Sequence, residues 1–295
     1  MVKLREFLQV DVFSERPGAG NPLAVVLDSD GLDDEAMQRI AAWTNLAETT
    51  FLLPPDTPDA DYRVRIFTTR QEIAFAGHPS IGSAFAALSA GQCRPRDGRL
   101  VQQCKAGLLP IDVSPDGTLA VRVPRSRIVR RAGDGLGEDA LLDAALGHAR
   151  RAPLAAALVE GGRRWWLAEL ADEAAVRDFV PDRVAIGALA AATDSLGLCL
   201  FARTGARDPA SAQLVVRAFP LGVGIAEDPA SGAANAAIAA FLDEAGALDA
   251  LGDRFAVSQG REMSRDARLV LRIDAERQVW VGGQCRAVVA GTLRW

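Results

Sequence analysis

The chain has 295 residues, 49% of them hydrophobic, and a formal net charge of −5. This length allows one large domain or two of ordinary size, and the composition is typical of a globular protein with a hydrophobic core. The acidic balance leaves no basic patch, so nucleic acid is not an expected partner. The N-terminus lacks an apolar signal segment, and no stretch reaches the roughly 18 apolar residues of a membrane span. We therefore expect a cytoplasmic protein without a membrane partner.

The first half of the chain is predicted to combine short strands with two helices. Apolar patterning predicts strands over residues 6–11, 23–27, 51–53 and 62–67, with a turn-rich loop over 16–22. Asp33 is the expected N-cap of a helix that carries Met37 and Ile40 on one face. Residues 81–88 are small and apolar, which predicts a second helix that is buried nearly all round.

The second half restarts after residues 124–127 and is predicted to repeat this pattern. Strands are expected over residues 165–170, 198–202, 214–218, 269–273, 279–281 and 286–289, and a very apolar helix over 233–241. We therefore predict an α+β protein of two similar halves, each a curved β-sheet wrapped round a central helix. The N-terminal half is set at residues 1–125 and the C-terminal half at 126–295. In the alternative considered, the last strand pairs back onto the first half.

Two turn motifs introduce the two apolar helices, about half a chain length apart. The first is Phe75-Ala76-Gly77-His78-Pro79, and the second is Glu227-Asp228-Pro229-Ala230-Ser231-Gly232, which has an acid where the first has a histidine. Helix N-termini present free N–H groups and the positive end of the helix dipole. Two such N-termini that face each other across a cleft would hold a small anion.

Glu48 is a candidate proton carrier between a helix end and a strand. If Ala47, Thr49, Phe51 and Leu53 face the core, Glu48 points the other way. The helix dipole does not stabilise a carboxylate there, and apolar neighbours would raise its pKa toward the range of proton transfer if it is enclosed. The alternative interpretation is an exposed loop carboxylate, and spacing alone does not decide between the two.

His78 and Asp228 each have a functional and a structural interpretation. A helix N-terminus would favour the neutral imidazole of His78, which can donate to or accept from a substrate. The alternative is a packed histidine with one hydrogen bond. Asp228 stands before Pro229 and can act as an N-cap, or it can hold a substrate hydroxyl or amine.

Other chemistries find little support in the sequence. His78 and His148 are the only histidines, so no histidine-rich metal site is expected. Lysine occurs only at Lys3 and Lys105, which weakens a Schiff-base mechanism. Ser80 lacks the preceding glycine of a nucleophile elbow, and no dinucleotide-binding or phosphate-binding loop occurs. The cysteines lack C-x-x-C spacing and are expected to be free, mostly buried thiols: Cys93, Cys104, Cys199 and Cys285.

Ordered motifs along essentially the whole chain resemble those of the phenazine-biosynthesis isomerase family (PhzF-like proteins). They include Gly20-Asn21-Pro22-Leu23-Ala24-Val25, Asn45-Leu46-Ala47-Glu48-Thr49-Thr50-Phe51, both turn motifs, and Ser258-Gln259-Gly260. The resemblance implies the diaminopimelate-epimerase-like fold of two similar α+β halves with the site in the cleft. It also implies a homodimer.

The resemblance further implies proton shuttling without a cofactor or metal, on a small, ring-containing carboxylic acid. Glu48 falls on the family's catalytic glutamate, which would move a proton between carbons of a substrate resembling dihydro-hydroxyanthranilate. His78 and Asp228 fall on its catalytic partners. The implied substrate-binding residues are Asn21, Gly77, Ser231, Gly232 and Ala233, with backbone N–H groups that hold the carboxylate.

Two departures from the family pattern leave the substrate open. Ala47 and Ala233 stand where the family usually has serine. An isomerase or epimerase acting on an unrelated acid is therefore an equal alternative. A non-catalytic carboxylate-binding protein is disfavoured by the intact Glu48. An amino-acid epimerase with two thiol bases is disfavoured because His78 and Asp228, rather than cysteines, occupy the turn motifs.

Overall fold

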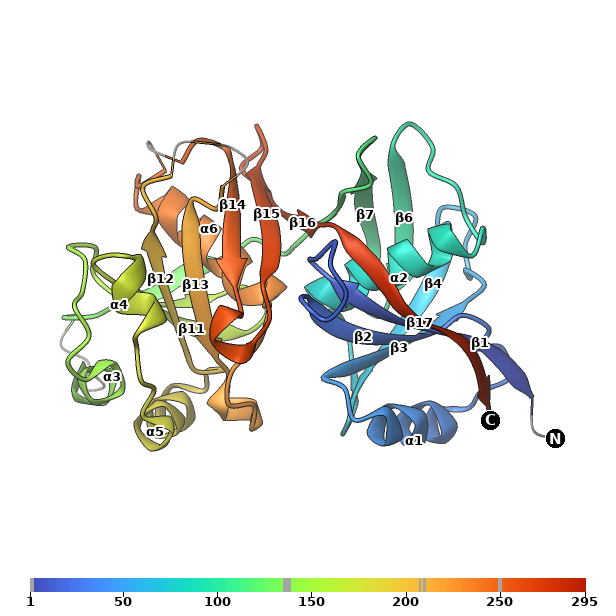
Figure 1. The fold of residues 1–295 in the computed structure, drawn as a ribbon, viewed down its shortest axis with the longest axis horizontal. Helices are drawn as coiled ribbons and strands as arrows, with labels where there is room; N and C mark the ends of the chain where they lie inside the picture. Colours follow the sequence, from blue (N-terminus) through green and yellow to red (C-terminus); the bar gives the residue numbers. More distant parts are fainter. Residues whose placement is uncertain (1–2, 135–138, 207, 209–210, 249–250) are drawn as a thin grey trace. The chain divides into compact units, whose positions relative to one another are not determined.

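The computed structural model describes residues 3–134, 139–206, 208, 211–248 and 251–295. The chain forms two compact units (Figure 1), the first of residues 1–122 with 282–295 and the second of residues 123–281. The sequence-based division lay between residues 125 and 126, with the last strand assigned to the second half. In the structure, β17 (Cys285–Arg294) pairs antiparallel with β1 (Leu4–Val12). Lys3 and Trp295 also exchange backbone hydrogen bonds of 2.9 and 3.0 Å.

The first unit is a curved mixed sheet round one helix. Its remaining strands are β2 (Asn21–Val26), β3 (Glu48–Leu53), β4 (Tyr62–Thr68), β5 (Glu72–Ile73), β6 (Arg99–Cys104), β7 (Gly107–Val113) and β8 (Leu119–Arg122). Helix α2 (Gly77–Ser89) contacts β1, β2, β3, β4, β6, β8 and β17. The sheet therefore wraps round this helix. Helix α1 (Asp34–Thr44) packs against β3 and β4.

The second unit has the same plan. Its strands are β9 (Arg127–Arg131), β10 (Ala157–Glu160), β11 (Arg164–Glu169), β12 (Leu198–Arg203), β13 (Leu214–Phe219), β14 (Arg254–Gln259), β15 (Ala267–Ile273) and β16 (Val279–Gly283), which leads into the first unit. Helix α6 (Gly232–Glu244) contacts β9, β10, β11 and β15. The other helices are α3 (Asp139–Leu146), α4 (Glu173–Arg177) and α5 (Arg183–Thr193), with short 3₁₀ turns η1 (Leu221–Val223) and η2 (Arg261–Met263).

The pairing directions of the strands repeat between the units. In the first unit, β1 to β2, β2 to β3, β3 to β4, β4 to β6 and β6 to β7 run antiparallel, parallel, antiparallel, parallel and antiparallel. The series from β10 through β15 follows the same order. The predicted α+β fold with two similar halves is therefore confirmed. No helix in the described ranges is long and apolar enough to cross a membrane.

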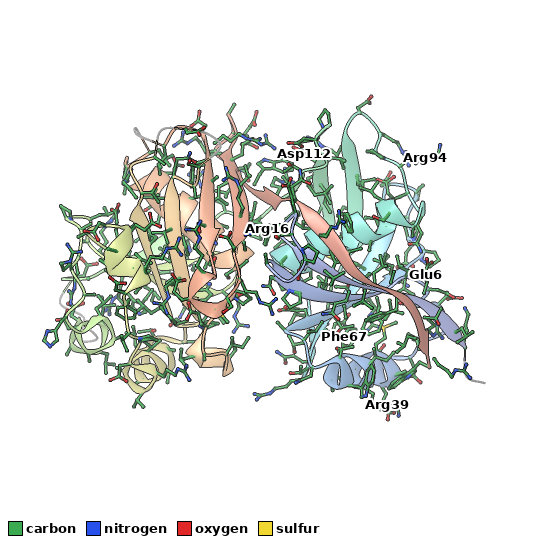
Figure 2. All side chains as sticks on the ribbon, viewed as in Figure 1. Glu6, Arg16, Arg39, Phe67, Arg94 and Asp112 are labelled. Carbon is green, nitrogen blue, oxygen red and sulfur yellow. The ribbon has the colours of Figure 1, made fainter. Side chains whose placement is uncertain are left out.

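Each face of the first sheet has its own packing. Helix α1 begins after Asp33, whose side chain accepts a 2.8 Å hydrogen bond from Ala36 N, as predicted for an N-cap. Its buried face meets Phe51 and Phe67, whose rings pack edge to face at 5.4 Å. Figure 2 shows Phe67 directed toward α1.

Helix α2 lies so close to the sheet that a side chain added at Gly82 would force Leu23 and Val12 to shift. A Cβ there would lie 2.5 Å from Leu23 Cδ2 and 2.8 Å from Val12 Cγ2. The buried hydroxyl of Ser83 donates to Thr50 Oγ1 at 2.9 Å, which satisfies a polar group on the enclosed face of the helix. Small residues on α2 therefore set the distance between this helix and β1 to β3.

We expect Gly82→Ala to destabilise the protein by about 1–3 kcal/mol, because the added methyl group overpacks a fixed interface. Gly187→Ala is the matched control: Gly187 is also helical, and a Cβ there meets nothing within 4 Å. It should stabilise by up to about 1 kcal/mol through helix propensity. Denaturant unfolding of both variants tests this, and equal shifts in the same direction would contradict it.

Candidate functional site

Glu48 begins β3 directly after the end of α1. Asn45 closes α1 in the left-handed conformation with φ 54°, and a 2.7 Å hydrogen bond between Thr44 Oγ1 and Thr49 Oγ1 fixes the short connection. Along β3, Phe51 faces α1, whereas Thr50 faces α2. Glu48 lies two residues before Thr50, so strand alternation directs it toward the α2 side.

His78 is the second residue of α2 and lies beside Glu48. The helix begins at Gly77, earlier than the predicted Ile81, because Pro79 is tolerated in a first helical turn. His78 is only 7% exposed, and its Nε2 lies 3.4 Å from Glu48 Oε2. Within the described residues, this nitrogen makes no hydrogen bond. A buried ring nitrogen without a hydrogen bond, next to a carboxylate, can form a hydrogen bond with a bound ligand.

The burial of His78 sets its charge. Desolvation lowers its pKa to about 3. At neutral pH the pair is therefore a neutral imidazole beside a carboxyl group, and not an ion pair. The neutral form is as predicted, but its cause is burial rather than the helix N-terminus.

The first turn of α2 offers backbone donors. Ala76, the N-cap residue, makes no side-chain hydrogen bond to the helix. The N–H groups of Gly77 and His78 have no partner within the helix, and Pro79 has no N–H to offer. The dipole of α2 adds positive potential at this point, which favours a negative group.

Buried polar contacts hold this first turn in place. Ser80 donates to Ala76 O at 2.9 Å, and Gln102 of β6 donates to Ser80 Oγ at 3.0 Å. The Tyr62 hydroxyl in turn donates to Gln102 Oε1 at 3.1 Å, and its burial raises the pKa of Tyr62 well above its ordinary value. The first turn of α2, which carries His78, is thereby held by side chains from β4 and β6.

Asn21 lies at the start of β2, in register with Val12 of β1, and is 2% exposed. The preceding Gly20 allows a close backbone approach, because a Cβ there would lie 2.4 Å from Val12 O. The structure puts Asn21 in the same unit as Glu48 and His78, and its role in binding remains a prediction.

Asp228 in the second unit belongs to a tight turn before α6. Its backbone N–H donates to Ala218 O at 2.9 Å, and its Oδ1 accepts from Ala230 N at 3.2 Å. The N-cap of α6 is Ser231, whose Oγ accepts from Ala234 N at 3.3 Å. The alternative in which Asp228 is the N-cap is therefore wrong, because its carboxylate closes the turn ahead of the helix.

The two turn motifs are not equivalent at the level of helix positions. His78 is the second residue of α2, and the second residue of α6 is the exposed Ala233, after Gly232. Asp228 precedes the helix, so it does not take the place of the histidine. The first N–H groups of α6, at Gly232 and Ala233, correspond in helix position to those of Gly77 and His78, and such groups lack a partner within the helix.

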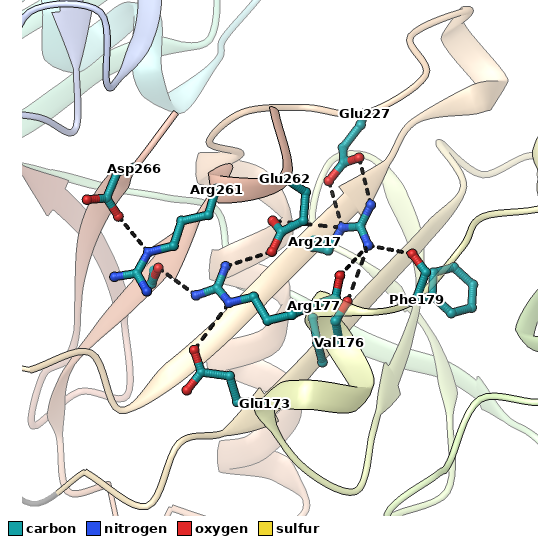
Figure 3. A network of polar contacts seen from close by, with 10 residues as sticks. Glu173, Val176, Arg177, Phe179, Arg217, Glu227, Arg261, Glu262 and Asp266 are labelled. Atoms are coloured by element: carbon teal, nitrogen blue, oxygen red, sulfur yellow. Dashed lines mark hydrogen bonds and ion pairs between the residues drawn. The ribbon is translucent and has the colours of Figure 1, made fainter. Parts of the chain in front are cut away.

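A buried guanidinium fixes the residue that precedes Asp228. Arg217 of β13 is 5% exposed and binds both carboxylate oxygens of Glu227 at 2.8 and 3.0 Å (Figure 3). Its remaining nitrogen donates to the carbonyl groups at the end of α4: Val176 at 3.3 Å, Arg177 at 3.4 Å and Phe179 at 2.6 Å. This contact was not predicted from the sequence. The signal was present, since a lone arginine in a strongly apolar strand must find a buried partner.

All four cysteines are free, with Cys104 and Cys199 buried. In the described part of the chain, no group of three or more histidine, cysteine or acidic residues is placed to hold a metal ion.

Comparison with known proteins relates the whole chain to one family. The family described as phenazine biosynthesis-like protein matches residues 10–291. The chain is 32% identical to antisense-enhancing sequence 1 from Schizosaccharomyces pombe, over 97% of each chain. It is 30% identical to trans-2,3-dihydro-3-hydroxyanthranilate isomerase from Pseudomonas aeruginosa, over 92% of this chain and 91% of the relative.

Solved structures show the same architecture. A PhzF-family protein from Bacillus anthracis matches with a TM-score of 0.82 at 23% identity, over 99% of each chain. A hydroxyproline epimerase from Agrobacterium vitis matches with a TM-score of 0.64 at 15% identity, over 99% of this chain and 92% of that one. The fold is therefore the two-domain α+β fold of PhzF-like and epimerase proteins.

The depressed pKa of His78 predicts a pH dependence of stability. An unfolded histidine has a pKa near 6.5, so between about pH 6.5 and 3 the unfolded chain binds a proton that the folded chain excludes. Stability should therefore fall with decreasing pH in this window, by up to about 1.4 kcal/mol per pH unit from this group.

Denaturant unfolding at several pH values tests this by comparing wild type with His78→Gln. The variant should show a shallower decline in the free energy of unfolding below pH 6.5. His148→Gln is the matched control, because it removes an exposed histidine from the other unit. Identical slopes for wild type and His78→Gln would contradict the assigned burial.

Proposed function

Because the chain belongs to the phenazine biosynthesis-like family and is an isomerase, we propose that it moves a proton between two carbons of a small carboxylic acid. Glu48 is the proposed general acid and base, and no cofactor takes part. The observation that carries this proposal is the 3.4 Å approach of Glu48 Oε2 to the buried, unsatisfied His78 Nε2 at the start of α2.

In the proposed reaction, the Glu48 carboxylate removes a proton from one carbon of the substrate. The electron pair left behind delocalises toward the substrate carboxylate, where negative charge develops. The neutral imidazole of His78 can donate a hydrogen bond to this charge, and the α2 dipole stabilises it. Protonated Glu48 then returns the proton to a second carbon, which completes the isomerisation without net acid or base.

We assign the turn of the second unit to substrate binding. Asp228 would hold a substrate hydroxyl or amine and assist proton movement, and Ser231, Gly232 and Ala233 would present the N-terminus of α6 to a carboxylate. The related enzyme from Pseudomonas aeruginosa supports a substrate that resembles 2,3-dihydro-3-hydroxyanthranilate. Ala233 lacks a hydroxyl that could bind such a substrate, so substrate selection at this point depends on backbone donors.

The cysteines support a carboxylate base rather than thiol bases. Burial raises the pKa of Cys93 to about 11 and that of Cys285 to about 12, and it also raises the pKa values of Cys104 and Cys199. Thiols held in the neutral form are poor bases and nucleophiles at neutral pH. None of them lies in a turn motif.

Solvent-deuterium incorporation into 2,3-dihydro-3-hydroxyanthranilate and a panel of small carboxylic acids tests the function. Wild type should incorporate deuterium, and Glu48→Gln should do so about 10²- to 10⁴-fold more slowly, because it lacks the proton carrier. Glu6→Gln, on the exposed face of β1, is the control and should match wild type.

Binding measured alongside exchange separates the alternatives. If wild type binds an acid but exchanges nothing, the protein is a carboxylate-binding module. If Glu48→Gln exchanges as fast as wild type, Glu48 is not the base. Exchange confined to acids other than dihydro-hydroxyanthranilate would retain the mechanism and change the substrate.

We also propose that the protein is a homodimer, and the exposed strand β17 supports a docking surface for the second copy. Residues 286–292 of this strand are exposed, with Val288 at 45% and Val289 at 46%, and no charge interrupts residues 287–293. A contiguous exposed apolar surface of this kind is typical of a protein–protein contact. Sedimentation velocity should show a dimer for wild type and a monomer for Val289→Lys, and a wild-type monomer would exclude the proposal.

A further inference from the structure

The side-chain amide of Gln259 closes the turn that carries Asp228. Gln259 is the last residue of β14 and is fully buried. Its Nε2 donates to the carbonyl oxygen of Asp228 at 2.8 Å, and its Oε1 accepts from the backbone N–H of Ser231 at 3.2 Å. One planar group thus bonds to both ends of the turn, as a peptide unit on a neighbouring strand would.

Neighbouring polar groups fix the orientation of this amide. Asn235 of α6 donates through Nδ2 to Gln259 Oε1 at 2.8 Å and to Ser231 O at 2.8 Å. Because Oε1 accepts two donors and Nε2 faces a carbonyl group, exchanging the two ends of the Gln259 amide would oppose like groups at every contact. Losing these contacts in a site without solvent would leave several backbone groups unsatisfied.

The backbone after Gln259 leaves little freedom for the turn. Gly260 has φ +94°, and a Cβ at this residue would lie 2.5 Å from Pro229 O. The end of β14 therefore lies directly against the turn. At the other side, Arg217 binds Glu227, which is the residue just before Asp228 (Figure 3). The Asp228 carboxylate and the first N–H groups of α6 owe their positions to these two supports.

We propose that Gln259 is a positioning residue for the isomerase reaction, and that it acts through Asp228 and the N-terminus of α6. The inference rests on the proposed function, because it assumes that Asp228 meets the substrate. Gln259 itself does not touch the reacting atoms. Its amide sets the distance and direction from which Asp228 and the α6 donors act.

Kinetic coupling tests this role. Gln259→Met retains the volume but loses both hydrogen-bonding groups, and it should lower kcat by about 100-fold, because a displacement of about 1 Å at a reacting group has an effect of that size. In the Asp228→Asn background, the same substitution should lower kcat less, since its route through Asp228 is already removed and only the route through the α6 donors remains. Equal losses in both backgrounds would overturn the proposal.

A charge variant gives a second readout. Gln259→Glu retains the oxygen that accepts from Ser231 N and Asn235 Nδ2, but at neutral pH it places a carboxylate against the Asp228 carbonyl group. Protonation would restore a donor at this position, so the activity relative to wild type should recover as pH falls. Gln213→Glu is the matched control, because the Gln213 amide likewise bridges backbone groups, Ala256 N at 2.7 Å and Ser211 O at 2.7 Å, away from the turn. A ratio that does not change with pH would oppose the assignment.

Amide hydrogen exchange separates this inference from the proposed function. Gln259→Met should abolish the protection of the Ser231 N–H, and Gln213→Met should leave it unchanged. Retained protection in Gln259→Met would overturn the inference regardless of activity. A third outcome is that protection is lost in Gln259→Met while the wild-type protein turns over no acid. That result would overturn the proposed function and the kinetic role, and Gln259 would still hold the turn in place.

Discussion

The second unit depends on the burial of one positive charge. A guanidinium removed from water is tolerated only where its charge and its donors are all matched, and Arg217 meets this condition through Glu227 and the terminal carbonyl groups of α4. Strand β13, helix α4 and the segment before Asp228 can therefore reach their native positions only together. The candidate site is built on this requirement, because Glu227 is the residue next to Asp228. The first unit uses neutral groups for the same purpose, in the contacts of Ser80, Gln102 and Tyr62 beneath α2.

Much of the fold was predictable because it follows from local patterns. The helices α2 and α6 consist of small and apolar residues, which identify a buried helix without knowledge of its partners. Alternating residues identified β4, and the half-length repeat predicted two similar units. The sequence indicates that Arg217 needs a buried partner but does not identify Glu227 as that partner. The contact of Gln259 could not be derived from local patterns, since Gln259 and Asp228 are 31 residues apart in the chain. The exact start of α2 also depended on whether Pro79 stood inside or before its first turn.

The two units share one fold, but the residues at the N-termini of their central helices differ. Both units share one order of strand directions and one central helix, yet the second helical residue is His78 in one and Ala233 in the other. The resemblance between the motifs suggested matching roles for His78 and Asp228, and the structure separates their positions. Glu48 was identified mainly because it falls on the family motif, since the neighbouring residues in the sequence are also compatible with an exposed loop carboxylate. The approach of His78 to Glu48 became visible only when β3 and α2 were placed side by side.

The return of the final strand to β1 has a consequence for biosynthesis. The first unit lacks β17 until residues 285–294 have been made, whereas all residues of the second unit precede that strand. A nascent chain usually folds its N-terminal domain first. Here the whole second unit would emerge from the ribosome before β17 is available to the first unit. Until then, the edge of β1 that pairs with β17 stays unpaired. The hydrogen bonds between Lys3 and Trp295 belong to the same late pairing of two segments that lie far apart in the sequence.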